Sequence, residues 1–146
     1  MAEADSFSVS VADWQRDETD IAQIRRRVFI EEQAVPEAME WEARDAECDW
    51  FVARDAGGAI VGIARLTPDA HIGRMAVLPD WRRRGVGSAL LQAALARARQ
   101  KGLARIGLHA QVHALGFYAR LGFAAQGPEF DEAGIPHREM FLDLTE

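Results

Sequence analysis

The chain has 146 residues, of which 49% are apolar and 27% charged, so it has the composition of an ordinary folded domain. This excludes a disordered chain, a coiled-coil rod and a collagen-like repeat, and the length predicts a single domain over 1–146, at roughly 150 residues per domain. Seventeen basic and 23 acidic residues give a net charge of −6, which argues against a nucleic-acid partner.

The cysteine content and the length of the apolar runs bear on where in the cell the protein is expected to lie. Cys48 is the only cysteine, so no disulfide within the chain and no cysteine-based zinc cluster is possible, and a cytoplasmic location is expected. The first ten residues lack the basic start and apolar middle of a signal peptide. No apolar run reaches the roughly 18 residues of a membrane span, so no membrane partner is expected.

Hydrophobic periodicity predicts the elements in chain order. Alternation predicts a first strand, and helical spacing then predicts a helix that begins near the capping residues 17–19 and ends near Gln33, before Pro36. A hairpin through Gly57 and Gly58 follows. The strands are expected at 6–11, 50–53, 60–66, 71–78, 106–110, 123–130 and 137–144, with further helices at 86–101 and 114–121 and a final turn at 134–136.

The order of these elements predicts a mixed α/β fold with a single sheet. The long helix is expected to end at Gly102. One face of this helix is apolar and is expected to face the core: Val86, Leu90, Leu91, Ala94, Leu95 and Ala98.

The turn before the long helix has the composition of an anion site. Arg82, Arg83 and Arg84 lie at a helix N-terminus, where the macrodipole disfavours cations. Gly85 and Gly87 allow close backbone approach, so free amides, dipole and arginines together predict a site for a multiply charged anion such as a pyrophosphate. A solvated basic turn is the alternative.

Two common phosphate motifs do not fit this turn. A Walker loop needs Lys followed by Ser or Thr after its last glycine, but Gly87 is followed by Ser88 and Ala89. The dinucleotide fingerprint needs a glycine where Leu90 stands.

The pattern Arg82-x-x-Gly85-x-Gly87, after a strand that ends at 75–79, resembles the acetyl-CoA signature of the GNAT superfamily of N-acetyltransferases. The segment 116–123, GFYARLGF, is similar to the second motif of that family. The stretches 28–33 and 129–137 resemble a small bacterial subgroup whose substrates are largely unassigned. The resemblance covers nearly the whole chain and implies a mostly antiparallel sheet of six to seven strands, flanked by about four helices and splayed in the middle.

The resemblance implies acetyl-CoA as co-substrate. The backbone amides of Arg84, Gly85, Val86, Gly87 and Ser88 would cradle the pyrophosphate, and Arg82 and Arg83 would add positive charge. The pantetheine arm would run beside the strand at Met75, Ala76 and Val77, where a backbone N–H would face the acetyl carbonyl. Gln111, Phe117 and Tyr118 are further cofactor-binding candidates by the same resemblance.

Tyr118 is the only tyrosine and matches the general acid of the family. A phenol with a pKa near 10 is protonated at neutral pH and could donate to a leaving thiolate whose pKa is near 8.5. The alternative is a core aromatic with an incidental hydroxyl.

The sequence leaves the general base open. Glu32 and His137 are the first candidates for a base or an acceptor-site residue, followed by His109 and His71, and a chain of water molecules is another route. Cys48 is interpreted as a small buried apolar residue rather than a nucleophile, because no paired base stands near it in the sequence. The acidic segment 37–49 is interpreted as a solvated loop, or else as an attractor of a cationic amine, and no metal site is expected, since calcium-loop spacing is absent.

The sequence therefore predicts an N-acetyltransferase that moves an acetyl group from acetyl-CoA to a primary amine of a small molecule or peptide, by direct transfer in a ternary complex. A non-catalytic acyl-CoA-binding or sensing module is the alternative, and a binder of another nucleotide phosphate is a third reading. Members of the family often form homodimers, so a homodimer is also an expectation.

Overall fold

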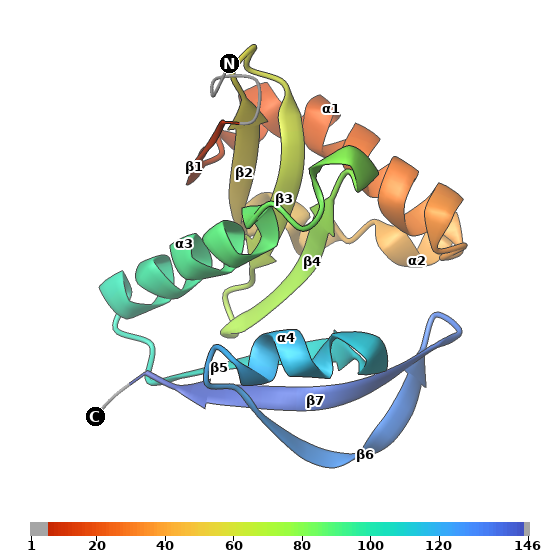
Figure 1. Ribbon diagram of the computed structural model, residues 1–146, viewed down its shortest axis with the longest axis vertical. Coiled ribbons are helices and arrows are strands. Elements are labelled where there is room, and N and C mark those ends of the chain that lie inside the picture. Colours follow the sequence, from red (N-terminus) through yellow and green to blue (C-terminus); the bar gives the residue numbers. More distant parts are fainter. Residues whose placement is uncertain (1–5, 145–146) are drawn as a thin grey trace.

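The computed structural model describes residues 6–144, which form one seven-stranded sheet in the order β1-β2-β3-β4-β5-β7-β6 (Figure 1). The ends of the predicted domain, 1–5 and 145–146, lie outside the described residues. The strands are β1 Phe7–Val11, β2 Asp49–Asp55, β3 Ile60–Leu66, β4 His71–Val77, β5 Arg105–Gln111, β6 Ala124–Glu132 and β7 Ile135–Asp143. The α-helices are α1 Trp14–Arg25, α2 Glu37–Glu40, α3 Val86–Gln100 and α4 Leu115–Ala119. The predicted mixed, mostly antiparallel fold is thus confirmed.

Helices cover both faces of the β1–β4 part of the sheet. Phe51 and Ala53 of β2 pack in one apolar cluster with α3, whereas Trp50 and Val52 pack in a second cluster with α1. Successive strand residues point to opposite faces, so α1 and α3 lie on opposite sides. The six residues predicted for the inner face of α3 are all buried.

The sheet separates between β4 and β5. These strands form the only parallel pair in the described sheet, and only His71 with Gly107 and Ile72 with Leu108 are paired. Beyond this point β4 runs away from β5 (Figure 1). The edge of β4 from Gly73 to Val77 therefore has no strand partner on the β5 side, and the predicted splay lies here.

Several predicted element ends differ from the structure by one or two residues, and two predictions differ in ways that have a clear physical reason. The first helix begins at Trp14 rather than near 17–19, because the side chain of Asp13 accepts the N–H of Arg16 and caps it. It continues as a π-helical segment, Arg26–Glu32, before Pro36. The final turn was wrongly placed at 134–136, since Pro136 lies inside β7. Pro136 is tolerated there because β5 pairing ends at His137, so β5 requires no N–H from the proline.

No helix among residues 6–144 has the length and apolar character that crossing a bilayer would require.

Candidate active site

A groove follows the separation of β4 and β5 and has two adjoining parts. One part, of about 660 Å³, lies beside Met75, Ala76 and Val77 and reaches Arg82 and Phe117. The other, of about 620 Å³, lies among charged and histidine side chains from β3, β4, β5 and β7. The two parts share the lining residues Gln33, Met75, Gln111, His113, Ala114 and Ile135. A reacting group could therefore enter from each end and meet near Met75.

Tyr118 stands at this meeting point. Its hydroxyl lies 3.6 Å from the Sδ atom of Met75 on β4, and its ring packs edge-on against Phe117 and Phe123. Burial raises the pKa of Tyr118 to about 12, because the phenolate would lose its hydration. The hydroxyl is therefore protonated throughout the ordinary pH range and is positioned as a proton or hydrogen-bond donor.

The arginine- and glycine-containing turn lies at the start of α3, next to the groove. Arg83 and Gly85 have left-handed φ angles of 64° and 85°, which turn the chain sharply into the helix. The carbonyl of Gly85 accepts the N–H of Ala89, so the N–H groups just before Ala89 have no helical acceptor. A Cβ added at Gly87 would lie 3.9 Å from both Phe117 and Val77, so the turn closely approaches α4 and β4. These features fit a phosphate group.

The three arginines of this turn differ in their surroundings. The Arg82 guanidinium forms a two-pronged ion pair with Glu32, with both N···O distances 2.7 Å, and its Nε donates to the carbonyl of Val77. Arg84 lies over the Trp81 ring at 5.1 Å, and Arg83 is exposed. The Arg82–Glu32 pair joins the π-helical segment to the turn across the groove.

This pair changes the interpretation of Glu32. The hydrogen bond from Arg82 holds the pKa of Glu32 below its usual range. A carboxylate in such a pair is a weak base, and it lies in the part of the groove beside the turn rather than in the histidine-rich part. Its geometry is that of a residue that positions Arg82.

The three candidate histidines, His71, His109 and His137, line the other part of the groove. His137 is buried, and its Nδ1 must donate to the Ile135 carbonyl at 2.7 Å, so Nε2 carries the lone pair of the neutral ring. This Nε2 lies 3.8 Å from a carboxylate oxygen of Glu132, which is not its hydrogen-bond donor. The Nδ1 of His109 lies 2.9 Å from Glu132. Gln111 donates to Gln33 at 3.2 Å at the boundary between the two parts. Glu132 and Gln33 were not singled out as site residues, although both lie in the stretches 28–33 and 129–137 that resemble the bacterial subgroup.

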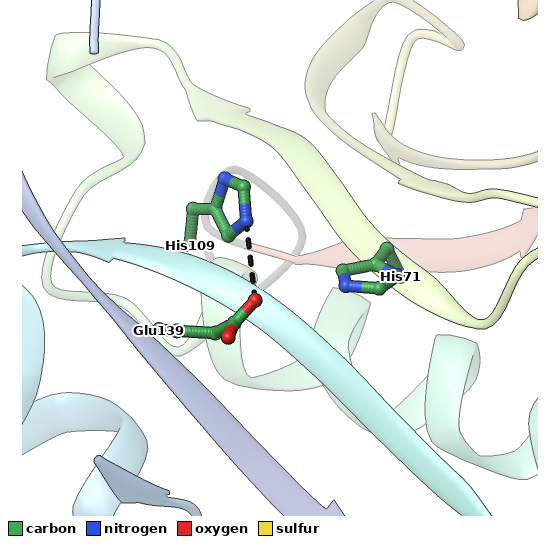
Figure 2. Close-up of side chains that lie close together, drawn as sticks. All are labelled: His71, His109 and Glu139. Atoms are coloured by element: carbon green, nitrogen blue, oxygen red, sulfur yellow. Dashed lines mark ion pairs between the residues drawn. The ribbon is translucent and has the colours of Figure 1, made fainter. Parts of the chain in front are cut away.

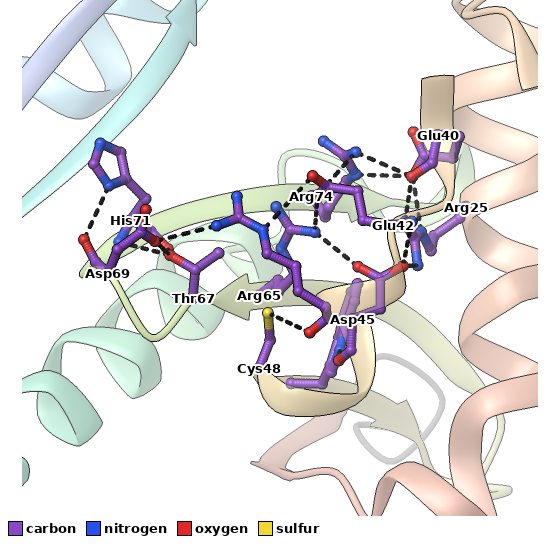
Figure 3. Close-up of polar contacts among 12 residues, drawn as sticks. Arg25, Glu40, Glu42, Asp45, Cys48, Arg65, Thr67, Asp69, His71 and Arg74 are labelled. Carbon is purple, nitrogen blue, oxygen red and sulfur yellow. Dashed lines mark hydrogen bonds and ion pairs between the residues drawn. The ribbon is translucent and has the colours of Figure 1, made fainter. Parts of the chain in front are cut away.

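The acidic segment is not the solvated loop that its composition predicted. Glu40 and Asp45 are buried, and Arg25 of α1 contacts them at 2.7 and 2.9 Å. Arg65 of β3 contacts Asp45 at 2.8 Å, and Arg74 of β4 forms an ion pair with Glu40 at 3.1 Å (Figure 3). The composition was misleading because the cations that neutralise the segment come from three distant elements.

This ion network lines the groove and includes groups with shifted pKa values. Burial raises the pKa of Glu40 despite its arginine neighbours. Burial also opposes ionisation of Asp45, but the N–H of Glu42 and the charge of Arg25 outweigh it and lower the pKa of Asp45. Arg65, Arg74 and Glu42 form part of the groove wall, so this end of the groove presents charges of both signs.

Cys48 does not have the surroundings of a nucleophile. The thiol is buried, lies 3.3 Å from the carbonyl of Arg44, and has a pKa raised by burial. A raised pKa keeps it in the unreactive thiol form. It is also absent from the residues that line the groove.

The fold and the groove can now be compared with known proteins. The sequence model of the acetyltransferase (GNAT) domain matches residues 11–144. YyaT of Bacillus subtilis is 35% identical over 127 residues, which cover 84% of this chain and 86% of that protein. YjcF of Bacillus subtilis, by name an uncharacterized N-acetyltransferase, is 34% identical over 124 residues, covering 82% of this chain and 88% of that protein.

A solved structure shows the same architecture. The crystal structure of an acyl-CoA N-acyltransferase from Pseudomonas aeruginosa superimposes with a TM-score of 0.82 and 26% identity. The match covers 94% of this chain and 99% of the other. The match over nearly the whole chain, together with the two relatives, leads to one conclusion: the chain belongs to the GNAT superfamily of acetyltransferases.

Proposed function

We propose that this protein is an N-acetyltransferase that moves the acetyl group of acetyl-CoA directly to a primary amine of a small molecule or peptide. The family supports acyl transfer from an acyl-CoA in general. The observation that carries the finer proposal is the unpaired edge of β4, which has the Tyr118 hydroxyl beside Met75 and the amides of the α3 turn at one end.

The residues on this edge suit an acyl transfer. An extended chain carrying amide groups could run beside Met75, Ala76 and Val77 and pair along this open edge of β4, as an added strand would. The carbonyl of Val77 already accepts the Nε–H of Arg82. A pyrophosphate at the end of that chain would suit the N-terminal amides of α3. The left-handed residues Arg83 and Gly85 turn the chain into the helix at this point. A backbone N–H of β4 would stabilise the oxyanion that forms when the amine attacks the thioester carbonyl.

Tyr118 would assist departure of the thiolate. Its pKa of about 12 lies above the roughly 8.5 of an ordinary thiol, so full proton transfer to an unperturbed thiolate is uphill. The same burial would raise the pKa of a thiol beside it, which reduces this gap. Tyr118 therefore acts first as a hydrogen-bond donor and passes its proton as the carbon–sulfur bond breaks.

Among the base candidates we propose His137. It lies in the histidine-rich part of the groove with Nε2 as an acceptor, whereas Glu32 is paired with Arg82 in the other part. His137 would remove the proton that the attacking amine releases. We place the reaction in the cytoplasm, in keeping with the single cysteine.

Two-substrate kinetics test the proposal. Thiol release from acetyl-CoA is measured with a panel of primary amines, with both concentrations varied for any active amine. Direct transfer predicts lines that intersect in a double-reciprocal plot. Parallel lines would indicate an acetylated enzyme intermediate and would contradict direct transfer in a ternary complex.

The alternative is a non-catalytic acyl-CoA-binding module, because the α3 turn would serve it equally well. That function predicts binding of acetyl-CoA by calorimetry with no thiol release across the amine panel. Tyr118 at the unpaired edge of β4 favours the enzyme, since binding alone has no need of a proton donor there.

A further inference from the structure

Two histidines and a glutamate converge where β4 and β5 begin to separate. His71 of β4 pairs with Gly107 of β5, His109 lies two residues further along β5, and Glu139 of β7 pairs directly with His109. One potential ligand atom from each side chain lies within 4.8 Å of the other two (Figure 2). The residues come from three adjacent strands, so the sheet itself brings them together.

Backbone and carboxylate partners orient both imidazoles. The Nδ1 of His71 lies 3.2 Å from the carbonyl of Asp69, and the Nδ1 of His109 lies 2.9 Å from Glu132. A carbonyl and a carboxylate only accept, so each Nδ1 carries a proton. Each Nε2 is then left with a free lone pair when the ring is neutral, which is the arrangement found in histidines that bind metals.

The charge around His109 favours a cation. Its Nε2 lies 3.6 Å from the Glu139 carboxylate, while its Nδ1 already donates to the Glu132 carboxylate. A neutral imidazole would direct its lone pair at the negative charge of Glu139, which is repulsive. A proton on Nε2 or a metal ion between the two groups removes this repulsion.

The positions need only small adjustment to hold an ion. Tetrahedral Zn²⁺ binds histidine nitrogen and carboxylate oxygen at about 2.0–2.2 Å, which sets the ligands about 3.4 Å apart. His109 and Glu139 are near this spacing at 3.6 Å, and both side chains are partly exposed. The His71 nitrogen lies within 4.8 Å of the other two ligand atoms, so it must move closer by at most about 1.4 Å to meet the same spacing. Gly107 leaves room for its ring, because an added Cβ there would lie 3.0 Å from His71 Nε2.

We propose that His71, His109 and Glu139 form a binding site for a divalent transition-metal ion, with Zn²⁺ as the matching ion. Two imidazoles and one carboxylate suit Zn²⁺ better than Ca²⁺ or Mg²⁺, which prefer oxygen ligands throughout. Three protein ligands leave a fourth position open. The ion would link β4, β5 and β7 at the mouth of the groove, where His71 and His109 are lining residues.

Calorimetric titration of Zn²⁺ into the full chain without an affinity tag tests this site. We expect one ion per chain, with affinity falling about 10-fold or more in His71→Ala and in Glu139→Gln, because each removes one of three ligands. Circular dichroism confirms that the variants are folded.

The chain offers two matched controls. His113 is an exposed histidine outside the cluster, so His113→Ala should bind Zn²⁺ as the wild type does. Cys48→Ala should do the same, and Co²⁺ should give a spectrum without a thiolate band. The proposal is overturned if the wild type binds no stoichiometric Zn²⁺, or if the His113 or Cys48 variant loses as much affinity as the His71 variant.

Discussion

At the scale of single residues, the ring and the hydroxyl of Tyr118 contact different neighbours. The ring packs against Phe117 and Phe123, and the hydroxyl contacts the Met75 sulfur at 3.6 Å. A phenylalanine would retain the ring contacts and lose only the donor. The role proposed for the hydroxyl can therefore be tested with little change in packing.

We expect Tyr118→Phe to lower kcat by about 10²–10⁴-fold while the Kd for acetyl-CoA stays within about 3-fold, since a proton donor acts during the reaction and not in binding. Steady-state kinetics and calorimetry measure the two quantities. Because the pKa of Tyr118 is about 12, wild-type kcat should show no alkaline decline from this residue below about pH 11. An unchanged rate in the variant at every pH would remove Tyr118 from the mechanism.

At the scale of elements, α3 contributes to the core along one face and to the groove at its N-terminus. Its buried face fixes it against the sheet, and its N-terminal turn presents amides to the groove. Gly85 and Gly102 flank the helix, have φ angles of 85° and 77°, and have no atom within 4 Å of an added Cβ. The two ends of one helix thus form a matched pair for substitution.

We expect Gly85→Glu to weaken acetyl-CoA binding by about 10-fold or more, because it adds negative charge to the anion site, a factor of ten being 1.4 kcal/mol. Gly102→Glu adds the same charge and the same backbone strain at the far end, and its affinity should match the wild type. Calorimetry with acetyl-CoA, CoA, ATP and NAD measures the binding affinities of both variants. Equal losses in the two variants, or tighter binding of ATP or NAD than of CoA, would contradict the assignment of this turn to CoA.

At the scale of the whole molecule, the buried ion network connects α1, the acidic segment, β3 and β4 (Figure 3). Arg25 is only 1% exposed and donates to Glu40 and Asp45. Removing one member of a buried ion pair leaves a charge without its partner in a poorly hydrated place. The network therefore holds the segment against the groove wall.

We expect Arg25→Met to lower the free energy of unfolding by about 3 kcal/mol, near the low end for breaking a buried pair, because Arg65 and Arg74 still contact the two carboxylates. Urea unfolding measures the change. Arg44→Met is the control, since Arg44 is 41% exposed and its ion pairs are 3.4 Å or longer, so a change within about 0.5 kcal/mol is expected. Similar losses in both variants would show that the network does not stabilise the fold.

Local patterns in the sequence were sufficient to predict most of the fold and the arginine- and glycine-containing turn before α3. The apolar face of α3, the β2–β3 hairpin and the turn around Gly85 depend on neighbours a few residues apart, so periodicity and turn chemistry reveal them. Tyr118 was found because its motif is contiguous. The start of the first helix was missed because Asp13 caps it earlier than the residues with stronger helical spacing.

The partners in the ion pairs could not be predicted from the sequence. Glu32 pairs with Arg82, Arg25 with Asp45, and His71 meets Glu139 only because β5 returns parallel to β4 and β7 lies beside β5. An ion pair depends on where two side chains meet in space, and the chain has many acidic and basic residues to choose from. The sequence by itself thus determined the elements and the α3 turn and singled out Tyr118 as a candidate, whereas the order of the strands decided which charges line the groove and which are buried.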